Sequence, residues 1–378
     1  MAMQLETNSF VTPRPVALVT YDHPVAGTTV EQRGSNQPLV PIVDVSAWGG
    51  ADGATNDEIA AAVDDACRTV GFMQIVGHGI PAHTLAAFTA ATDAFFALEP
   101  DRKAAYRCPP GVNRGYTPPR SEALANSLGI TTAADLFEAF NIGTQASDHP
   151  DLDLPAADYP ENVWPAVAGY REAVQAWFDA AGAVARTMTG IFADALGLEE
   201  HFFAARTTHS VDVLRMINYR MPSADEQLGP DQLGMGAHTD YGIVTVLWAD
   251  PVPGLEILGG DGSWHPVQPG PGALLVNLGD ALARWTNDQW ISTMHRVAPP
   301  RVDGVLVPRR SAAYFHDGNI DAVIAPLPTC VGPDRPALYE PVTVGDHLRA
   351  KLAGSRGGTL NASAQREAAR LAGPRATP

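Results

Sequence analysis

The C-terminal half of the chain carries a long series of short apolar segments, rich in β-branched residues and separated by glycine and proline. They lie at 211–219, 235–248, 254–258, 264–267, 273–277, around His295 and at 309–315. Segments of this length and composition, bounded by turn residues, are typical of strands. A succession of many short strands favours a β-sandwich or a jelly roll. We therefore expect the C-terminal half to be built on sheets.

Helical patterns dominate the rest of the chain. Between Trp164 and Leu196, apolar and aromatic residues recur every three to four positions and Gly197 follows, which predicts a long helix that packs against the sheet. Upstream we expect two shorter helices, at 57–70 with Asn56 as the N-cap and at 81–98, and two strands, at 41–45 and 72–76. The sequence thus predicts a mixed α/β (α+β) fold.

The expected organisation has four parts. Residues 1–38 form an arm, 39–160 an N-terminal region, 161–353 the core with its long helix, and 354–378 a disordered tail rich in Gly, Ala, Ser and Arg. Residues 107–160 are rich in proline and glycine, and we expect irregular loops there. A helix is expected at 342–352, near the end of the core.

His238 and Asp240 stand two residues apart at the start of one apolar segment. On a strand, residues i and i+2 point to the same face, so the imidazole and the carboxylate would project side by side. A third candidate ligand, His295, lies in another strand-like segment. Two histidines and one carboxylate form the donor set of many non-haem Fe(II) sites, and they leave coordination positions open for reactants.

Arg309 and Ser311 form a second pair at i and i+2, on the last strand-like segment. A guanidinium can bind a carboxylate through two hydrogen bonds, and a hydroxyl beside it can donate one more. Arg310 would point to the opposite face. The same three metal ligands would also suit a zinc hydrolase, but a carboxylate-binding Arg-x-Ser pair has no evident place in zinc-activated hydrolysis.

These motifs together resemble the isopenicillin N synthase-like family of Fe(II)/2-oxoglutarate-dependent dioxygenases. The likeness rests on residues 234–248, 271–280, 286–297 and Arg309-x-Ser311, and upstream on 41–44 and 70–80. The resemblance implies a double-stranded β-helix, the jelly-roll core of that family. It also implies Fe(II) held by His238, Asp240 and His295, and 2-oxoglutarate held by Arg309 and Ser311.

The family resemblance further implies a reaction, which is most often hydroxylation of a C–H bond in a small molecule. O2 is consumed, and 2-oxoglutarate leaves as succinate and CO2. By the same resemblance, Arg114, Tyr116, Tyr241 and Phe315 are candidate substrate contacts. Members often show Asn-x-Tyr-Pro, whose tyrosine also contacts the 2-oxo acid. Here Arg220 stands at that tyrosine's place, and Tyr219 is one residue early, which would flip its face on a strand.

Two alternatives remain open at the level of sequence. Some members of the family carry Arg-x-Ser and use no 2-oxoglutarate, because their arginine binds the substrate carboxylate instead. Such an enzyme would close a ring or desaturate its substrate, and ethylene formation is a related outcome. A non-catalytic, metal-sensing jelly roll is the other alternative, although the complete set of ligands disfavours it.

The net charge and the cysteine content limit the partners and the cellular compartment that we expect. The formal net charge of −17 argues against nucleic acid and against an anionic membrane surface as partners. Three widely spaced cysteines predict no disulfide framework, and they favour the reducing cytoplasm. The near absence of lysine beside abundant arginine and alanine suggests a GC-rich bacterial genome, so we expect an enzyme of bacterial secondary metabolism. The sequence does not indicate an oligomeric state.

Overall fold

The computed structural model describes residues 39–50, 52–125, 133–219, 228–229 and 232–357. The expected arm at 1–38, Arg220 and residues 358–378 of the expected tail lie outside these ranges. Within them, no helix is long and apolar enough to cross a membrane. All three cysteines lie in the described part of the chain, and each is a free thiol.

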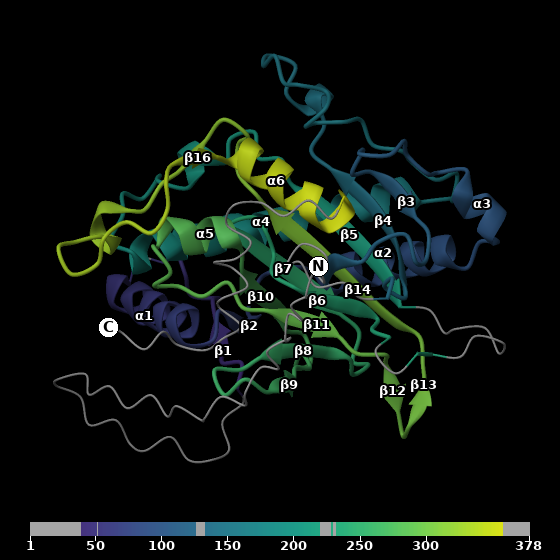
Figure 1. The fold of residues 1–378 in the computed structure, drawn as a ribbon, viewed down its shortest axis with the longest axis horizontal. Coiled ribbons are helices and arrows are strands. Elements are labelled where there is room, and N and C mark those ends of the chain that lie inside the picture. The colour runs from purple at the N-terminus through teal and green to yellow at the C-terminus, as the bar shows by residue number, and fades with distance from the viewer. Residues whose placement is uncertain (1–38, 51, 126–132, 220–227, 230–231, 358–378) are drawn as a thin grey trace, which may run out of the picture.

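An eight-stranded sheet forms the centre of the fold (Figure 1). Its strands, in spatial order, are β1 (Ile42–Asp44), β2 (Phe72–Val76), β10 (Leu274–Leu278), β7 (Val244–Ala249), β14 (Arg309–His316), β5 (Val213–Tyr219), β4 (Phe137–Gly143) and β3 (Gly115–Thr117). All neighbours are antiparallel except β1 and β2. Because β2 pairs with β10, strands from both halves of the chain share one sheet.

A smaller sheet faces the central part of the large one. It contains β6 (Met235–His238), β11 (His295–Val297), β8 (Leu255–Leu258) and β9 (Trp264–Pro266), in that order. Side chains of the two sheets meet in one buried apolar cluster, which includes Phe72 and Leu275 from the large sheet and Leu255, Ile257 and Val297 from the small one. This packing of sheet on sheet confirms the expected jelly-roll core.

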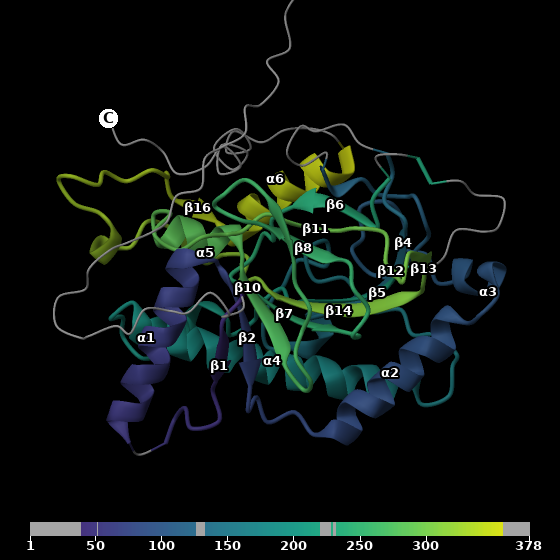
Figure 2. The ribbon, with the colours of Figure 1, turned by 90° about the horizontal axis from the view of Figure 1, so that it is seen from below.

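Three helices cover the other face of the large sheet, as Figure 2 shows. They are α1 (Gly53–Thr69), α2 (Ala82–Phe96) and α4 (Tyr170–Ala195). Trp177 of α4 stacks on Phe88 of α2 with ring centroids 4.8 Å apart, and both rings belong to the main apolar core. The prediction of a long helix that packs against the sheet is confirmed.

Shorter elements complete the described chain. They are α3 (Pro100–Ala104), α5 (Asp280–Trp285), β12 (Arg301–Val302), β13 (Val305–Leu306), β15 (Val323–Ile324), β16 (Val342–Thr343), α6 (Val344–Gly357) and three single 3-10 turns at 146–148, 204–206 and 328–330. In Figure 2, α6 lies beside β6, on the side of the molecule away from α4. The helix expected at 342–352 is therefore present, although it begins two residues later.

Two helices begin elsewhere than the sequence predicts. Asp52, and not Asn56, caps α1, because its carboxylate accepts a hydrogen bond from the backbone N–H of Ala54 at 3.2 Å. Helix α4 begins at Tyr170, several residues after the expected start, because Gly169 has a left-handed backbone with φ of 70°.

The expectation of irregular loops across 107–160 is wrong for part of that region. Residues 137–143 form β4, a strand of seven buried residues between β3 and β5. The strand has no alternation of polar and apolar residues, because both of its faces are covered. Its Glu138 is buried in an ion pair with Lys103 at 2.8 Å and accepts a hydrogen bond from Asn218.

Candidate active site

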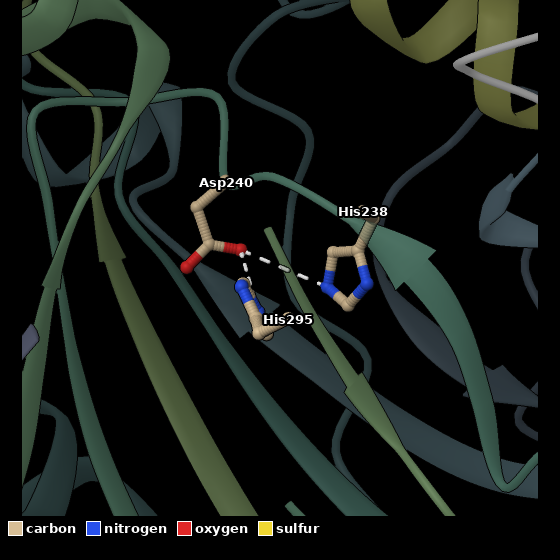
Figure 3. Close-up of side chains that lie close together, drawn as sticks. All are labelled: His238, Asp240 and His295. Atoms are coloured by element: carbon tan, nitrogen blue, oxygen red, sulfur yellow. Dashed lines mark ion pairs between the residues drawn. The ribbon is translucent and has the colours of Figure 1, made fainter. Parts of the chain in front are cut away.

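His238, Asp240 and His295 lie together at one end of the small sheet (Figure 3). His238 ends β6 and His295 begins β11, and the two are directly paired across these antiparallel strands. Asp240 follows in the turn after β6. Its Oδ1 atom lies 3.9 Å from Nε2 of His238 and 3.8 Å from Nε2 of His295. All three side chains are buried.

Hydrogen bonds to backbone carbonyls orient both imidazole rings. Nδ1 of His238 lies 2.8 Å from the carbonyl oxygen of Gly236, and Nδ1 of His295 lies 3.2 Å from that of Thr293. A carbonyl only accepts, so each Nδ1 is the donor, and each Nε2 is the nitrogen directed toward Asp240. Burial, together with the charge that His295 can carry, lowers the pKa of His238 to about 4. The ring of His238 is therefore neutral near pH 7, as metal coordination requires.

The carboxylate of Asp240 is fixed through its other oxygen. Oδ2 accepts hydrogen bonds from Oγ1 of Thr245 and Nδ2 of Asn277, each at 2.5 Å. Thr245 and Asn277 are themselves paired between β7 and β10. These contacts leave Oδ1 directed toward the two histidines. The motif search did not find Thr245 or Asn277, although a polar residue inside an apolar strand was the available signal.

The arrangement suits a divalent metal ion. Its donors are two imidazole nitrogens and one carboxylate oxygen, which all lie within 4.8 Å of one another. Outer-shell hydrogen bonds hold every ligand, as is usual for metal sites in proteins. The chain has a second His-x-Asp triplet at 149–151, but it lies in a loop and takes no part in this cluster.

A cavity of about 530 Å³ opens beside the three side chains. Alternate residues of two neighbouring strands form one wall. From β14 and the residue after it, the wall receives Arg309, Ser311, Ala313, Phe315 and Asp317, and from β5 it receives Val213, Arg215, Ile217 and Tyr219. The expected pairing of Arg309 with Ser311 on one face therefore holds. Arg310 points to the opposite face and forms an ion pair with Asp93 of α2 at 3.0 Å.

One end of this wall carries a buried guanidinium that forms no ion pair within the described residues, although burial raises the pKa of Asp250 and the charge of this guanidinium acts, less strongly, to lower it. Arg309 is 2 % exposed, its Nε donates to the carbonyl of Val252 at 3.2 Å, and its Nη1 has no hydrogen-bond partner among the described residues. Its Cζ lies 5.1 Å from the ring centre of Tyr219. A buried cation of this kind is costly unless an anion joins it.

Tyr219 belongs to the same end of the cavity, contrary to the expectation from its displaced motif. It pairs directly with Arg309 across β5 and β14, and it lines the cavity. Burial raises the pKa of the Tyr219 phenol, so the hydroxyl stays protonated and can donate. Tyr219 therefore lies on the cavity wall even though it stands one residue before the position of the motif's tyrosine. Its pairing with Arg309 of β14 decides which face of β5 it occupies.

A second guanidinium lies farther along β5. Arg215 forms an ion pair with Glu122 at 2.7 Å, and both side chains are about nine-tenths buried. Its Cζ stacks 4.9 Å from the ring centre of Phe137, and its buried Nε has no partner among the described residues. Sequence reasoning missed both Arg215 and Glu122. Glu122 stands in a loop, where no periodic pattern marks it.

The predicted substrate contacts divide into two groups. Arg114, Tyr241 and Phe315 line the cavity. Tyr116 does not, and that prediction is wrong. Its ring lies in the main apolar core on the helical side of the sheet, and its hydroxyl donates to Glu138 at 2.5 Å. Gly115, with φ of 70°, separates Arg114 from Tyr116 and directs their side chains to different surroundings.

Comparison with known proteins agrees with this geometry. Residues 40–167 match the model of the N-terminal region of non-haem dioxygenases in morphine synthesis, and residues 211–318 match that of the 2OG-Fe(II) oxygenase superfamily. A 2-oxoglutarate-Fe(II) type oxidoreductase, hxnY of Emericella nidulans, is 35 % identical over 316 residues, which are 82 % of this chain and 88 % of that protein. Validamycin A dioxygenase of Streptomyces hygroscopicus subsp. limoneus is 35 % identical over 300 residues, 78 % of this chain and 80 % of that enzyme.

Solved structures show the same likeness. T7H of Neurospora crassa, in complex with alpha-KG, superposes with a TM-score of 0.74 at 29 % identity, over 86 % of this chain and 98 % of that one. The family requires Fe(II), 2-oxoglutarate and O2. The chain belongs to the 2OG-Fe(II) oxygenase superfamily, and it is a non-haem dioxygenase that acts on a small molecule.

Proposed function

We propose that the enzyme hydroxylates a C–H bond of its small-molecule substrate and converts 2-oxoglutarate and O2 to succinate and CO2. His238, Asp240 and His295 hold Fe(II). Arg309, with Ser311 and Tyr219 beside it, binds the far carboxylate of 2-oxoglutarate. The observation that carries this proposal is the buried Nη1 of Arg309, which has no partner among the described residues and lies on the cavity wall beside the metal ligands. An incoming carboxylate would satisfy it.

The chain's own residues prepare this chemistry in three ways. Thr245 and Asn277 restrain Asp240, so one carboxylate oxygen remains for the metal. Gly236 and Thr293 fix the imidazole tautomers through their carbonyls. Bound iron supplies the activation of O2, and the buried walls keep bulk water from the reacting centre.

Substrate would occupy the part of the cavity beyond Tyr219. Arg215 and Glu122 offer a donor and an acceptor side by side, while Tyr241 and Phe315 offer aromatic surface. Asp317 also lines this part. Burial, followed by the nearby carboxylates of Asp212 and Asp240, raises its pKa well above the ordinary value. The Arg215–Glu122 pair is neutral as a whole. We infer that the substrate group that meets this pair is polar and uncharged, with both an acceptor and a donor.

Named relatives do not narrow the substrate further. One solved complex of Neurospora crassa T7H contains thymine, and its chain is 27 % identical to this one. Another relative is the homoarginine-6-hydroxylase of Oryza sativa, at 28 % identity. These two compounds differ in size and charge. Our inference about the substrate of this chain therefore rests on the residues that line its cavity.

We further infer that the enzyme works in the reducing cytoplasm and that it has a role in bacterial secondary metabolism. We also infer that residues 39–160 and 161–353 form one structural unit. Three free thiols support the first inference, and arginine-rich coding supports a bacterial source. The strands that the two regions share support the single unit. Comparison of extracts from a deletion strain and its parent would test the role. An altered set of specialised metabolites is expected, and a changed growth requirement instead would contradict it.

The reaction itself is tested by succinate formation. Purified protein with Fe(II), 2-oxoglutarate and O2 should release succinate slowly without substrate, and His295→Ala should abolish that release. Substrate candidates are then ranked by how much they accelerate it. Release of succinate that does not depend on His295, or none under any condition with iron bound, would contradict the proposal.

A further inference from the structure

Lys351 is one of two lysines in the chain, and its ammonium group is fully buried. It projects from α6, and its Nζ lies 2.5 Å from Oδ2 of Asp280 at the start of α5. Neither side chain has any exposed surface. A buried ion pair is seldom a gain in stability over apolar packing, so its position calls for another explanation.

Asp280 connects this ion pair to the metal-ligand segment. The same Oδ2 accepts a hydrogen bond from Oγ1 of Thr239 at 2.9 Å. The backbone N–H of Asp280 donates to the carbonyl of Asp240 at 2.8 Å. Asp280 thus contacts both the residue between the two ligands of the His-Thr-Asp motif and the backbone of the second ligand.

His347 makes a second contact from the same helix. It lies four residues before Lys351, so the two side chains project from one face of α6. Its Nε2 lies 2.9 Å from the carbonyl oxygen of Tyr241, the residue after Asp240. Because a carbonyl only accepts, Nε2 is the donor. Burial, and then the charge of Lys351, lowers the pKa of His347 to about 4, so the ring is a neutral donor near pH 7.

The ligand segment needs such support, because no strand holds it beyond His238. Strand β6 ends at His238, and residues 239–241 are irregular. Gly242 closes the turn, and a Cβ there would lie 1.8 Å from Oδ1 of Asp317. Helix α6 contacts this turn through His347, and its Leu348 and Leu352 line the cavity. One helix therefore walls the cavity and contacts the turn that carries Asp240.

We propose that α6 is a positioning element of the metal centre: Lys351 acts through Asp280, and His347 acts through the carbonyl of Tyr241, to fix the backbone on both sides of Asp240. This inference rests on the proposed ligand role of Asp240. Outer-shell partners of metal ligands typically change metal affinity about 10- to 100-fold when they are removed. By linkage, metal binding must strengthen the docking of α6 by the same factor.

The first test is an anaerobic titration of the whole protein with Mn(II), a redox-inert substitute for Fe(II). We expect Lys351→Met to weaken Mn(II) binding about 10- to 100-fold. His347→Leu should act in the same direction, and His347→Gln, which keeps a donor, should recover part of the loss.

Two control variants separate positioning from loss of a buried charge. Lys103→Met removes the other buried lysine, which pairs with Glu138 at 2.8 Å far from the ligand turn. Arg349→Met removes a cation of α6 that pairs with Asp158 at 2.8 Å near the surface. Both should keep Mn(II) affinity within about twofold even if the melting temperature falls. Equal losses of affinity in Lys351→Met and Lys103→Met would overturn the proposal.

The double variant Lys351→Met, Asp280→Asn covers the case in which the single variant is merely unstable. It leaves no uncompensated buried charge, so stability should recover while Mn(II) affinity stays low. Recovery of affinity to the wild-type value would show that charge burial, and not positioning, caused the effect.

Hydrogen exchange of the backbone amides of α6 provides a readout other than affinity. Mn(II) should slow exchange of the peptide that covers 344–354 in the wild type and not in Lys351→Met. Unchanged exchange in a wild type that does bind Mn(II) would overturn the coupling. A wild type that binds no Mn(II) at all would instead contradict the proposed ligand roles, so the two failures are distinguishable.

Discussion

Two guanidinium groups, those of Arg215 and Arg309, lie on the same wall of the cavity and differ in their ionic partners. Arg215 stacks on Phe137, Arg309 stacks on Tyr219, and the two rings meet edge-on with centroids 6.4 Å apart. Arg215 has a carboxylate partner in Glu122 at 2.7 Å. Arg309 has no ion pair within the described part of the chain, and its Nη1 is buried without a partner.

We therefore propose that the two ends of the cavity bind different reactants. A buried cation that forms no ion pair within the described residues can bind an anionic ligand, and 2-oxoglutarate has two carboxylates. A cation that the chain has already neutralised would bind a second anion poorly, because Glu122 would repel it. The Arg309 end therefore suits the cosubstrate, and the Arg215 end suits an uncharged polar group of the substrate.

Removal of the partner of Arg215 should have the largest effect. Glu122→Gln leaves the buried guanidinium of Arg215 without its counter-charge, and we expect a loss of about 3 kcal/mol in the free energy of unfolding. Denaturant unfolding with and without 2-oxoglutarate measures this. The double variant with Arg215→Met should regain most of the loss. If Glu122→Gln is as stable as the wild type, Glu122 does not neutralise the charge of Arg215 in the folded protein.

A smaller effect is expected at the other end. Ser311→Ala removes one hydroxyl donor beside Arg309 and should weaken 2-oxoglutarate about 10-fold, which is the usual size for one hydrogen bond to a charged group. The KM for 2-oxoglutarate in the succinate assay measures it, and Fe(II) affinity should not change. An unchanged KM would place the cosubstrate carboxylate elsewhere.

An effect that vanishes near pH 4 and depends on pH is expected at Asp317. Its folded pKa is raised well above the ordinary value by burial and by the carboxylates of Asp212 and Asp240. The folded state therefore holds a proton that the unfolded state releases, and stability is lost as pH rises above the unfolded pKa. Asp317→Asn removes this loss. Its melting temperature should match the wild type near pH 4 and exceed it at higher pH, whereas a constant difference would mean an ionised Asp317.

Much of the fold could be predicted, because the spacing of apolar residues in the sequence indicates most of its helices and strands. The stripe of apolar residues in α4 and the β-branched segments after Val211 each follow one period. Strand β4 escaped prediction because it is buried on both faces and has no period of its own. The start of α4 was also missed, since a single glycine with a left-handed backbone sets it.

Local spacing likewise explains what could be predicted of the site. Arg309 and Ser311 are a pair at i and i+2 on one face of β14, as predicted. His238 and Asp240 also come together, but β6 ends at His238 and the turn after it, and not a shared strand face, brings Asp240 to the site. Arg215, Glu122, Thr245 and Asn277 act through partners distant in sequence, so only the folded register reveals them. Tyr116 was wrongly predicted because one glycine redirects the chain after Arg114.

The most direct test of the account is an anaerobic titration of Fe(II)-loaded protein with 2-oxoglutarate, followed by the visible charge-transfer band of the iron chelate. Wild type and Arg215→Met should both develop the band with similar affinity. Arg309→Met should require about 100-fold more 2-oxoglutarate or show no band, because it loses a buried charge pair. A band of undiminished affinity in Arg309→Met, or its loss in Arg215→Met alone, would contradict the assignment of the two ends.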